Sequence, residues 1–529
     1  MLTPDSLTKG RYLWVRPDAQ SRWLWKHLGH YLADRTGLQL LFITSSVEDK
    51  RFYEAAFGIP FRGEIVVAAD FYSHVVDGGD TVVDDCSVIR RGRAYERRHG
   101  INLMRHMILA DRHLGRGFII GAKGHPKSAI SEKADLRRAL EACLVSADFY
   151  DKLAERFPPV LVIGYSIGGG LSGKPLALLC RERGTCFRSI VSSRFGNLFF
   201  WATDEYARCP EFERFFRSFP APNDSEVAAV QARLAPNALA GPEMLHKLRV
   251  NLRWSRIAKT SLYHIAHRIY AKTRGYRKAK IGYHVSATIA QIVRSRLYFD
   301  RLRRIGRRDL SGLEGRKLVF FPLQQEPESS TLVLTPYHSN QFAILLELAL
   351  SMPADAILVV KEHMWQLGRR TRGFYEQILA LPNVIMVDPT YPALDIIRRS
   401  VAVCAISSSA AHEAAVLGRP VFYFQKGSTL ELLDHVYVVE SACDLDRINE
   451  SLEENGAEAE RGRCRNGARY LLALEKFCFR IDGPSIALRA NPPCEEELAD
   501  MTSALLASLP DACRRKSDAV ATAKLEGRQ

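Results

Sequence analysis

The feature that most limits the fold of this sequence is a repeated alternation of short apolar runs and amphipathic segments between residues 317 and 424. The runs lack the polar–apolar alternation of a half-exposed strand, so they are typical of strands buried on both faces. The intervening segments have helical length and spacing. We therefore expect a parallel, doubly wound α/β domain, which is a Rossmann-like fold. Its predicted strands are 317–321, 356–360, 384–387, 401–406 and 420–424.

The N-terminal part of the chain shows the same alternation. It predicts a second Rossmann-like domain, because its strands also lack a polar face. Open sheets of this type bind ligands beyond the carboxyl ends of their strands, so two of them in tandem predict a ligand cleft. The expected strands are 11–15, 38–43, 64–69 and 159–163, with helices at 23–32 and 136–157. The expected divisions are an N-terminal acceptor domain 1–219, a basic helical region 220–316, a C-terminal nucleotide-sugar-binding domain 317–479, and a helix with a loose tail 480–529.

The positive charge of the chain is concentrated in one segment. Residues 245–308 hold 18 Lys and Arg against the single acid Asp300, while the whole chain has a net charge of +15. This surplus predicts an extended anionic partner, and we expect an anionic membrane surface. A nucleic acid would also suit interleaved cations and tyrosines, but no nucleic-acid-binding signature is present, so we expect none. A solvated helical face is the plainer alternative.

Composition and cysteine usage indicate a cytoplasmic globular protein. The start of the sequence has no apolar signal core, and no run of about 18 apolar residues could span a membrane. The 11 cysteines are scattered, without a CxxC pair or zinc-like spacing. We read them as reduced thiols in a reducing compartment and expect no structural metal.

Polar residues follow two predicted strands of the C-terminal domain. Ser407, Ser408 and Ser409 open a helix after the strand 401–406, and helix N-termini bind anions. Glu413, one turn later, suits a ribose diol, although an N-cap serine and a first-turn acid are an equally simple explanation. A cationic rim is expected after the strand 356–360. Its members are Lys361, His363, Arg369 and Arg370.

Four blocks of sequence then resemble a known family. They are FFPLQQEPESS at 320–330, VVKEH at 359–363, LPNV at 381–384 and ISSSAAHEAAVLGRPV at 406–421. Together they are similar to the capsule polysaccharide biosynthesis family, which includes bacterial Kdo transferases that use CMP-Kdo. The resemblance implies a GT-B-like fold, two Rossmann-like domains facing a cleft, and a metal-independent glycosyltransferase without a cofactor. A nucleotide sugar, with CMP favoured, and a glycan or lipid-linked acceptor are the implied partners.

The same resemblance implies roles for individual residues. In the family a His-Pro pair and a Ser/Thr pair contact the CMP part of the donor, which corresponds here to His363 and to Ser407 with Ser408 or Ser409. Gln324 and Gln325 would face the donor. Met364 stands where the family has proline, which weakens cytidine as the base and keeps a UDP-sugar transferase or an epimerase as alternatives.

Transfer also needs a base for the acceptor hydroxyl, and the N-terminal domain offers several carboxylates. We expect Glu96, whose arginine neighbours would keep it ionised, although a surface salt bridge explains those neighbours equally well. Asp111 is the second choice, and Asp84 and Asp85 are further options.

Two motif look-alikes occupy the loop after the strand 159–163. Gly164 to Gly168 matches the G-x-S-x-G elbow of α/β-hydrolases, with Ser166 as its nucleophile, so a hydrolase is the alternative from another reaction class. The glycines that follow and Lys174 fall one residue short of a phosphate-binding loop, because Pro175 occupies the Ser/Thr position. An acceptor-side loop of Gly168, Gly169, Gly170 and Lys174 is our interpretation.

Overall fold

The computed structural model divides the chain into two compact units, which we describe separately. The first holds residues 1–108, 135–214 and 474–529, and the second holds 109–134 and 215–473. The structure describes residues 11–18, 21–68, 71–76, 85–115, 125–165, 169–234, 246, 248–276, 282–453, 456–481 and 491–510.

The first unit is built on a seven-stranded sheet in the order β13-β6-β5-β4-β1-β2-β3. Strands β3, β2, β1, β4 and β5 are parallel, while β6 and β13 add an antiparallel edge. The central parallel strands β1, β2 and β4 are mainly apolar, as strands covered on both faces require. The strands are β1 (Tyr12–Arg16), β2 (Gln39–Thr44), β3 (Glu64–Val67), β4 (Pro159–Tyr165), β5 (Cys186–Ser192), β6 (Leu198–Ala202) and β13 (Phe479–Arg480).

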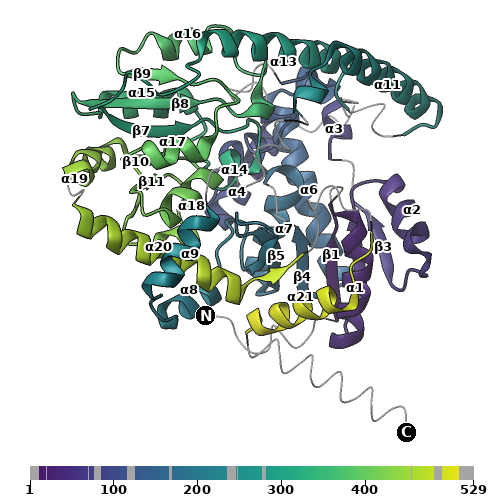
Figure 1. The fold of residues 1–529 in the computed structure, drawn as a ribbon. Helices are drawn as coiled ribbons and strands as arrows, with labels where there is room; N and C mark the ends of the chain where they lie inside the picture. The colour runs from purple at the N-terminus through teal and green to yellow at the C-terminus, as the bar shows by residue number, and fades with distance from the viewer. Residues whose placement is uncertain are drawn as a thin grey trace. The chain divides into compact units, whose positions relative to one another are not determined.

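Helices accompany the strands of the first unit (Figure 1). The longest, α6, begins at the N-cap Asp135, whose side chain accepts a hydrogen bond from the Arg138 backbone N–H. These helices are α1 (Arg22–Thr36), α2 (Val47–Ala55), α3 (Ser73–Val76), α4 (Asp85–His99), α6 (Leu136–Arg156), α7 (Gly170–Arg183) and α21 (Glu495–Ser508), with η2 (Ala56–Gly58) and the π-helical turn η3 (Met104–Ile108).

The C-terminal part of the chain completes the first unit. Strand β13 pairs with β6, and the Trp201 indole donates a hydrogen bond of 2.9 Å to the Met501 carbonyl on α21. Met501 and Leu505 are fully buried in the core of this unit. The described residues 480–481 and 491–510, which the sequence predicts as part of a separate helix and tail, therefore belong to the first domain. The tail beyond residue 510 lies outside the described residues.

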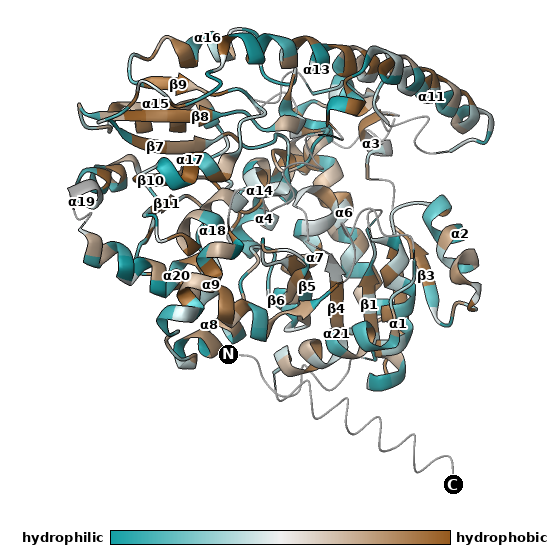
Figure 2. Ribbon diagram, viewed as in Figure 1, coloured by the Kyte–Doolittle hydropathy of each residue, from teal (hydrophilic) through white to brown (hydrophobic). Residues whose placement is uncertain are grey.

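The second unit holds a six-stranded, all-parallel sheet in the order β12-β11-β10-β7-β8-β9. Figure 2 shows β7 and β8 as strongly hydrophobic, in keeping with their burial between helices. The strands are β7 (Lys317–Pro322), β8 (Ala356–Lys361), β9 (Val384–Met386), β10 (Ala402–Ala405), β11 (Val421–Tyr423) and β12 (Val436–Val438).

The helices of the basic region belong to the second unit. The predicted boundary at residue 316 therefore does not divide two compact units. The chain enters this unit within α8 and leaves it within α20. The helices are α8 (Pro210–Ser218), α9 (Asp224–Arg233), α11 (Trp254–Thr273), α13 (Val285–Ile305), α14 (Ser329–Leu332), α15 (Gln341–Leu350), α16 (Phe374–Leu379), α17 (Ala393–Arg399), α18 (Ser409–Val416), α19 (Arg447–Glu453) and α20 (Ala457–Phe477), with α5 (Ala129–Lys133) from the 109–134 segment. Short turns η6 (Met364–Gln366), η7 (Thr429–Leu432) and η8 (Ala442–Asp446) link them.

Two Rossmann-like α/β domains are thus confirmed, and each predicted strand has a counterpart. Strands β5, β6, β12 and β13 have no counterpart among the predictions. Nine of the described cysteines have free thiols, but Cys186 is disulfide-bonded, so the expectation of reduced cysteines is wrong at that residue. Among the described residues, no helix combines the length and apolar character needed to cross a membrane.

Candidate functional site

The predicted donor residues lie at the carboxyl edge of the second sheet. Strand β7 runs between β8 on one side and β10 on the other, and all three are parallel, so the loops that follow them leave the same edge. The chain builds β8 and β9 on one side of β7 and then crosses over to β10. Ligands of open α/β sheets bind at such a switch point.

The serine loop joins β10 to helix α18. Ser407 is buried, and its hydroxyl donates a hydrogen bond of 2.9 Å to the Ser330 carbonyl in α14, which ties the β10 loop to the β7 loop. Ser408 is the N-cap of α18 and accepts from the Ala410 N–H at 3.2 Å. Ser409 is the first residue of that helix. A phosphate at this helix start would meet remaining backbone N–H groups and the positive end of the helix dipole.

Glu413 lies on the second turn of α18 and is half-buried. Burial alone raises the pKa of Glu413 to about 7. No donor or cation contacts this carboxylate among the residues that the structure describes, although buried polar groups are normally paired. A half-buried carboxylate without a partner, one turn from an anion site, suits a diol of a bound ligand.

The raised pKa of Glu413 predicts a pH dependence of stability that E413Q removes. The folded state holds this proton more tightly than the unfolded chain, so the contribution is favourable below the unfolded pKa and disappears as pH rises through about 7. We expect the melting temperature of the wild type to fall relative to E413Q between about pH 5 and pH 8. Parallel curves for the two proteins over this range would contradict the assignment.

His363 follows β8 and caps the turn η6. Its Nδ1 accepts from the Trp365 N–H at 3.3 Å, so the proton of the neutral ring lies on Nε2. Burial lowers the pKa of His363, although the Glu328 and Glu362 carboxylates act in the opposite direction. The ring is therefore neutral near pH 7 and presents Nε2–H as a hydrogen-bond donor.

The predicted cationic rim is only partly present. Lys361 ends β8, and burial lowers the pKa of its ammonium to about 8. Arg369 is half-buried, and its guanidinium has no hydrogen bond or ion pair within the described residues. Arg370 contradicts the prediction because its side chain is fully buried. It contacts Glu326 at 2.8 Å and Glu362 at 2.9 Å, so it joins the β7 and β8 loops rather than facing a ligand.

The glutamines after β7 differ in their surroundings. Gln324 is buried, and its backbone N–H and carbonyl are both bonded to the Gln341 side chain, so it has a structural role. Gln325 is half-buried. Glu328, which we did not predict, belongs to the site because it bonds the Ser330 hydroxyl at 3.1 Å and acts on the His363 ring. Its place in the resembling block EPESS could have revealed it.

A segment from the N-terminal half also belongs to the second unit. Leu109 and Ala110 pack against Leu332 of α14, the helix that receives the Ser407 hydrogen bond at Ser330. Asp111 follows directly. It is 6% exposed, and its Oδ1 accepts hydrogen bonds from the backbone N–H groups of His113 and Leu114. The structure thus places Asp111 in the unit that carries the serine loop, although the two are far apart in the sequence.

Glu96, the first choice as base, lies on α4 of the first unit. Its Oε1 accepts from the Leu103 N–H and its Oε2 pairs with Arg93, both at 3.0 Å. Arg98 pairs with Glu182 instead. The surroundings of Glu96 therefore agree with the alternative explanation, a local salt bridge. Asp85 begins α4, and Asp84 lies outside the described residues.

The glycine-rich segment forms the start of α7 rather than an open loop. Gly169 is the N-cap and Gly170 the first helical residue, with φ of +74°. Lys174 is 3% exposed and binds Glu205 at 2.7 Å, so the prediction that it faces an acceptor is wrong. Its charge is compensated inside the first unit. Gly168 and Ser166 lie outside the described residues.

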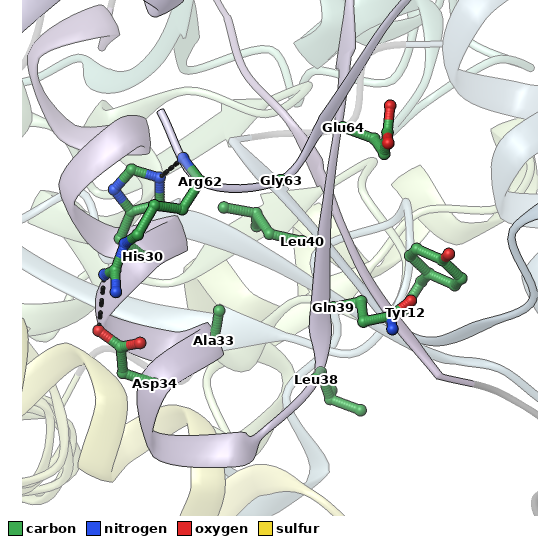
Figure 3. A pocket seen from close by; sticks show the side chains of 10 residues that line it. All are labelled: Tyr12, His30, Ala33, Asp34, Leu38, Gln39, Leu40, Arg62, Gly63 and Glu64. Carbon is green, nitrogen blue, oxygen red and sulfur yellow. Dashed lines mark hydrogen bonds and ion pairs between the residues drawn. The ribbon is translucent and has the colours of Figure 1, made fainter. Parts of the chain in front are cut away.

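A pocket of about 530 Å³ in the first unit is a separate feature. Figure 3 shows His30, Asp34 and Arg62 along one side, where Arg62 bonds the His30 ring through its backbone N–H and the Asp34 carboxylate through its side chain. The lining residues Tyr12 and Gln39 begin β1 and β2. Because ligands of parallel sheets bind at the opposite ends of the strands, we do not assign this pocket to the donor.

The sequence comparisons bear on the second unit. Residues 221–428 match the profile of the family described as capsule polysaccharide biosynthesis protein. The similarity to this family covers less than half of the chain and is limited to this segment. The segment contains every predicted donor-binding residue, and the family segment and paired parallel sheets support a glycosyltransferase enzyme. No functionally curated protein matches the chain.

Solved structures of sugar-nucleotide enzymes align with the chain at low similarity. UDP-GlcNAc 2-epimerase from Neisseria meningitidis has 9% identity, covers 88% of this chain and 99% of its own, and has a TM-score of 0.25. The beta Kdo 2,7 transferase KpsC of Thermosulfurimonas dismutans has 13% identity and a TM-score of 0.25, and the alignment covers 56% of this chain and 78% of that protein. The glycosyltransferase SnogD of Streptomyces nogalater has 11% identity and a TM-score of 0.21, and the alignment covers 88% of this chain and 99% of that protein. These scores are too low to support an argument about mechanism.

Proposed function

We propose that this chain is a cytoplasmic glycosyltransferase that transfers a sugar from a CMP-activated donor, with CMP-Kdo or a related sugar acid as first choice. The acceptor is a growing cell-surface polysaccharide or its lipid-linked primer. One observation carries the proposal. A neutral histidine donor follows β8, and a serine-capped helix with an unpartnered carboxylate follows β10, on the two sides of β7 in the capsule family segment.

The donor fits these groups in a definite order. The phosphate lies at the start of α18 beside Ser408 and Ser409, the Nε2–H of His363 donates to the same phosphate, and Glu413 accepts from the ribose hydroxyls. During transfer the acceptor oxygen attacks the anomeric carbon, and the bond from that carbon to the phosphate oxygen breaks. The phosphate keeps the electron pair, so donors fixed around it stabilise the charge that develops.

Asp111 is our proposal for the base that takes the proton of the acceptor hydroxyl. It belongs to the same unit as the donor groups, and its segment packs on α14, which is bonded to the serine loop. Glu96, in contrast, belongs to the first unit, where its oxygens bond the Leu103 N–H and Arg93. The backbone N–H groups of His113 and Leu114 hold the Asp111 carboxylate in place through its Oδ1.

A UDP-sugar is the second candidate for the donor. Met364 follows His363 where the resembling family has proline, so the surroundings of the base differ from those of CMP enzymes. An epimerase would release an altered sugar without an acceptor, so analysis of the reaction products separates it from a transferase.

Thermal-shift titration with CMP, CDP, UDP, GDP and CMP-Kdo tests the proposal. We expect CMP and CMP-Kdo to raise the melting temperature most, because a ligand present at about 100 times its Kd stabilises the folded state by about 2.7 kcal/mol. D111N should keep the full nucleotide shift and lose at least about 100-fold in transfer rate. A protein that no nucleotide stabilises would overturn the proposed site, and a D111N variant of normal rate would overturn the base.

A further inference from the structure

Helix α11 in the second unit has an apolar face that the described residues leave uncovered. Only Ile257 and Ala271 of its 20 residues are buried, and the helix packs against α13. Trp254, Leu262, Ile265 and Ile269 are 53%, 67%, 42% and 60% exposed. Large apolar side chains gathered on one exposed surface mark an interaction site rather than ordinary surface.

These four exposed residues, which we call the α11 stripe, form one continuous row. They follow one another at steps of eight, three and four residues, and at 3.6 residues per turn they fall within about 80° of the helix circumference. The buried residues Ile257 and Ala271 lie roughly 120° away by the same count. The stripe is thus a second apolar face, distinct from the one that holds α11 on the protein. In Figure 2 the ribbon of α11 alternates hydrophobic and hydrophilic segments, as such a helix must.

The charges of α11 select the partner. The helix carries four Lys and Arg residues and no Asp or Glu: Arg256, Lys259, Arg268 and Lys272. A second copy of this helix would bring like charges together around the stripe. A phospholipid surface offers acyl chains to the stripe and phosphates to the cations.

We propose that the α11 stripe docks the protein in the plane of an anionic phospholipid surface, with the helix parallel to the membrane. Trp254, Leu262, Ile265 and Ile269 enter the acyl boundary, and the lysines and arginines contact the headgroups. The proposed function supplies only the purpose of the docking, which is to bring the enzyme to a lipid-linked acceptor in the membrane. Binding itself requires no nucleotide, so its failure and the failure of sugar transfer are separate results.

Co-sedimentation of the full chain with vesicles tests the docking. We expect binding to phosphatidylcholine vesicles that contain about one-third phosphatidylglycerol, weak binding to phosphatidylcholine alone, and loss of binding at high salt. I265S/I269S should lower the partition coefficient at least about tenfold. The matched control L350S changes a side chain that is 72% exposed on α15 and should bind like the wild type. K259E/R268E should abolish the preference for anionic lipid.

A second measurement places the stripe directly and avoids disruptive substitutions. Trp254 should be quenched by lipids brominated in the acyl chain, and W254F should remove that part of the quenching while the protein remains bound. Equal binding to neutral and anionic vesicles, or unchanged binding of I265S/I269S, would overturn the proposal. So would a concentration-dependent dimer that I265S/I269S dissociates in the absence of lipid, because the stripe would then be covered by a second copy.

Discussion

H363A should lower the rate of sugar transfer by about 100- to 1,000-fold, the usual cost of removing one donor to a developing negative charge. The neutral imidazole is fixed at Nδ1 by the Trp365 N–H, so its Nε2–H is oriented before the donor arrives. Burial keeps the pKa of His363 below its ordinary value, which keeps the ring neutral at working pH. The rate constant kcat, rather than KM, should carry most of the loss, since the charge exists only during transfer.

The control for H363A is H363Q, whose amide retains an N–H donor at similar reach. We expect H363Q to recover part of the lost rate, and both variants to melt within a few degrees of the wild type. Rates are measured in single-turnover reactions with saturating donor, which separate chemistry from product release. If H363A transfers sugar within threefold of the wild-type rate, His363 does not contact the leaving phosphate.

The sequence predicts the second sheet well because its signals are local. Each of its first five strands is an unbroken apolar run, and each helix between them has a regular apolar face, so neighbouring residues determine both. Strand β12 follows β11 without an intervening α-helix, and β6 runs antiparallel to β5 directly after it, so both break the strand–helix order. Those strands are defined by their pairing with neighbouring strands rather than by a local sequence pattern, so the sequence does not predict them.

Charged residues are where prediction from the sequence fails, for a physical reason. Isolated Lys and Arg are normally exposed, so Lys174 and Arg370 indicated surfaces that face a ligand. Both are buried, because carboxylates distant in sequence compensate them: Glu205 for Lys174, and Glu326 for Arg370. Such pairs form only after the chain has folded. The sequence therefore indicates where the loops after the strands lie but does not show which of their charges point inward.

The placement of Asp111 illustrates a second limit. Its neighbours in sequence belong to the first unit, yet residues 109–134 join the second. The contacts responsible are long-range: Leu109 and Ala110 reach Leu332, and the ring of His113 stacks on Tyr283 at 4.8 Å. No periodic pattern records such contacts. A carboxylate that seemed to belong to the acceptor domain thus lies in the same unit as the donor residues.

R370A should destabilise the second unit by about 3–5 kcal/mol, the cost of removing one partner from a buried ion pair. The Arg370 side chain is fully buried between Glu326 and Glu362, donates to the Gln324 carbonyl at 2.7 Å, and lies 4.9 Å from the Phe374 ring. Its loss leaves two carboxylates in an apolar interior without a counter-ion, and it frees the β7 loop from the β8 loop.

The pH dependence of R370A distinguishes this electrostatic cause from a simple loss of packing. Burial already raises the pKa of Glu326, and without the guanidinium this carboxylate should take up a proton more readily. The folded variant then binds more protons than its unfolded chain, so its stability should recover as the pH falls toward about 5, which narrows the difference from the wild type. Arg372, exposed two residues away, gives the matched control, because R372A should change the free energy of unfolding by less than about 0.5 kcal/mol. Urea unfolding of the three proteins at two pH values measures these differences, and equal stability of R370A and R372A would show that the buried network does not hold the donor loops in place.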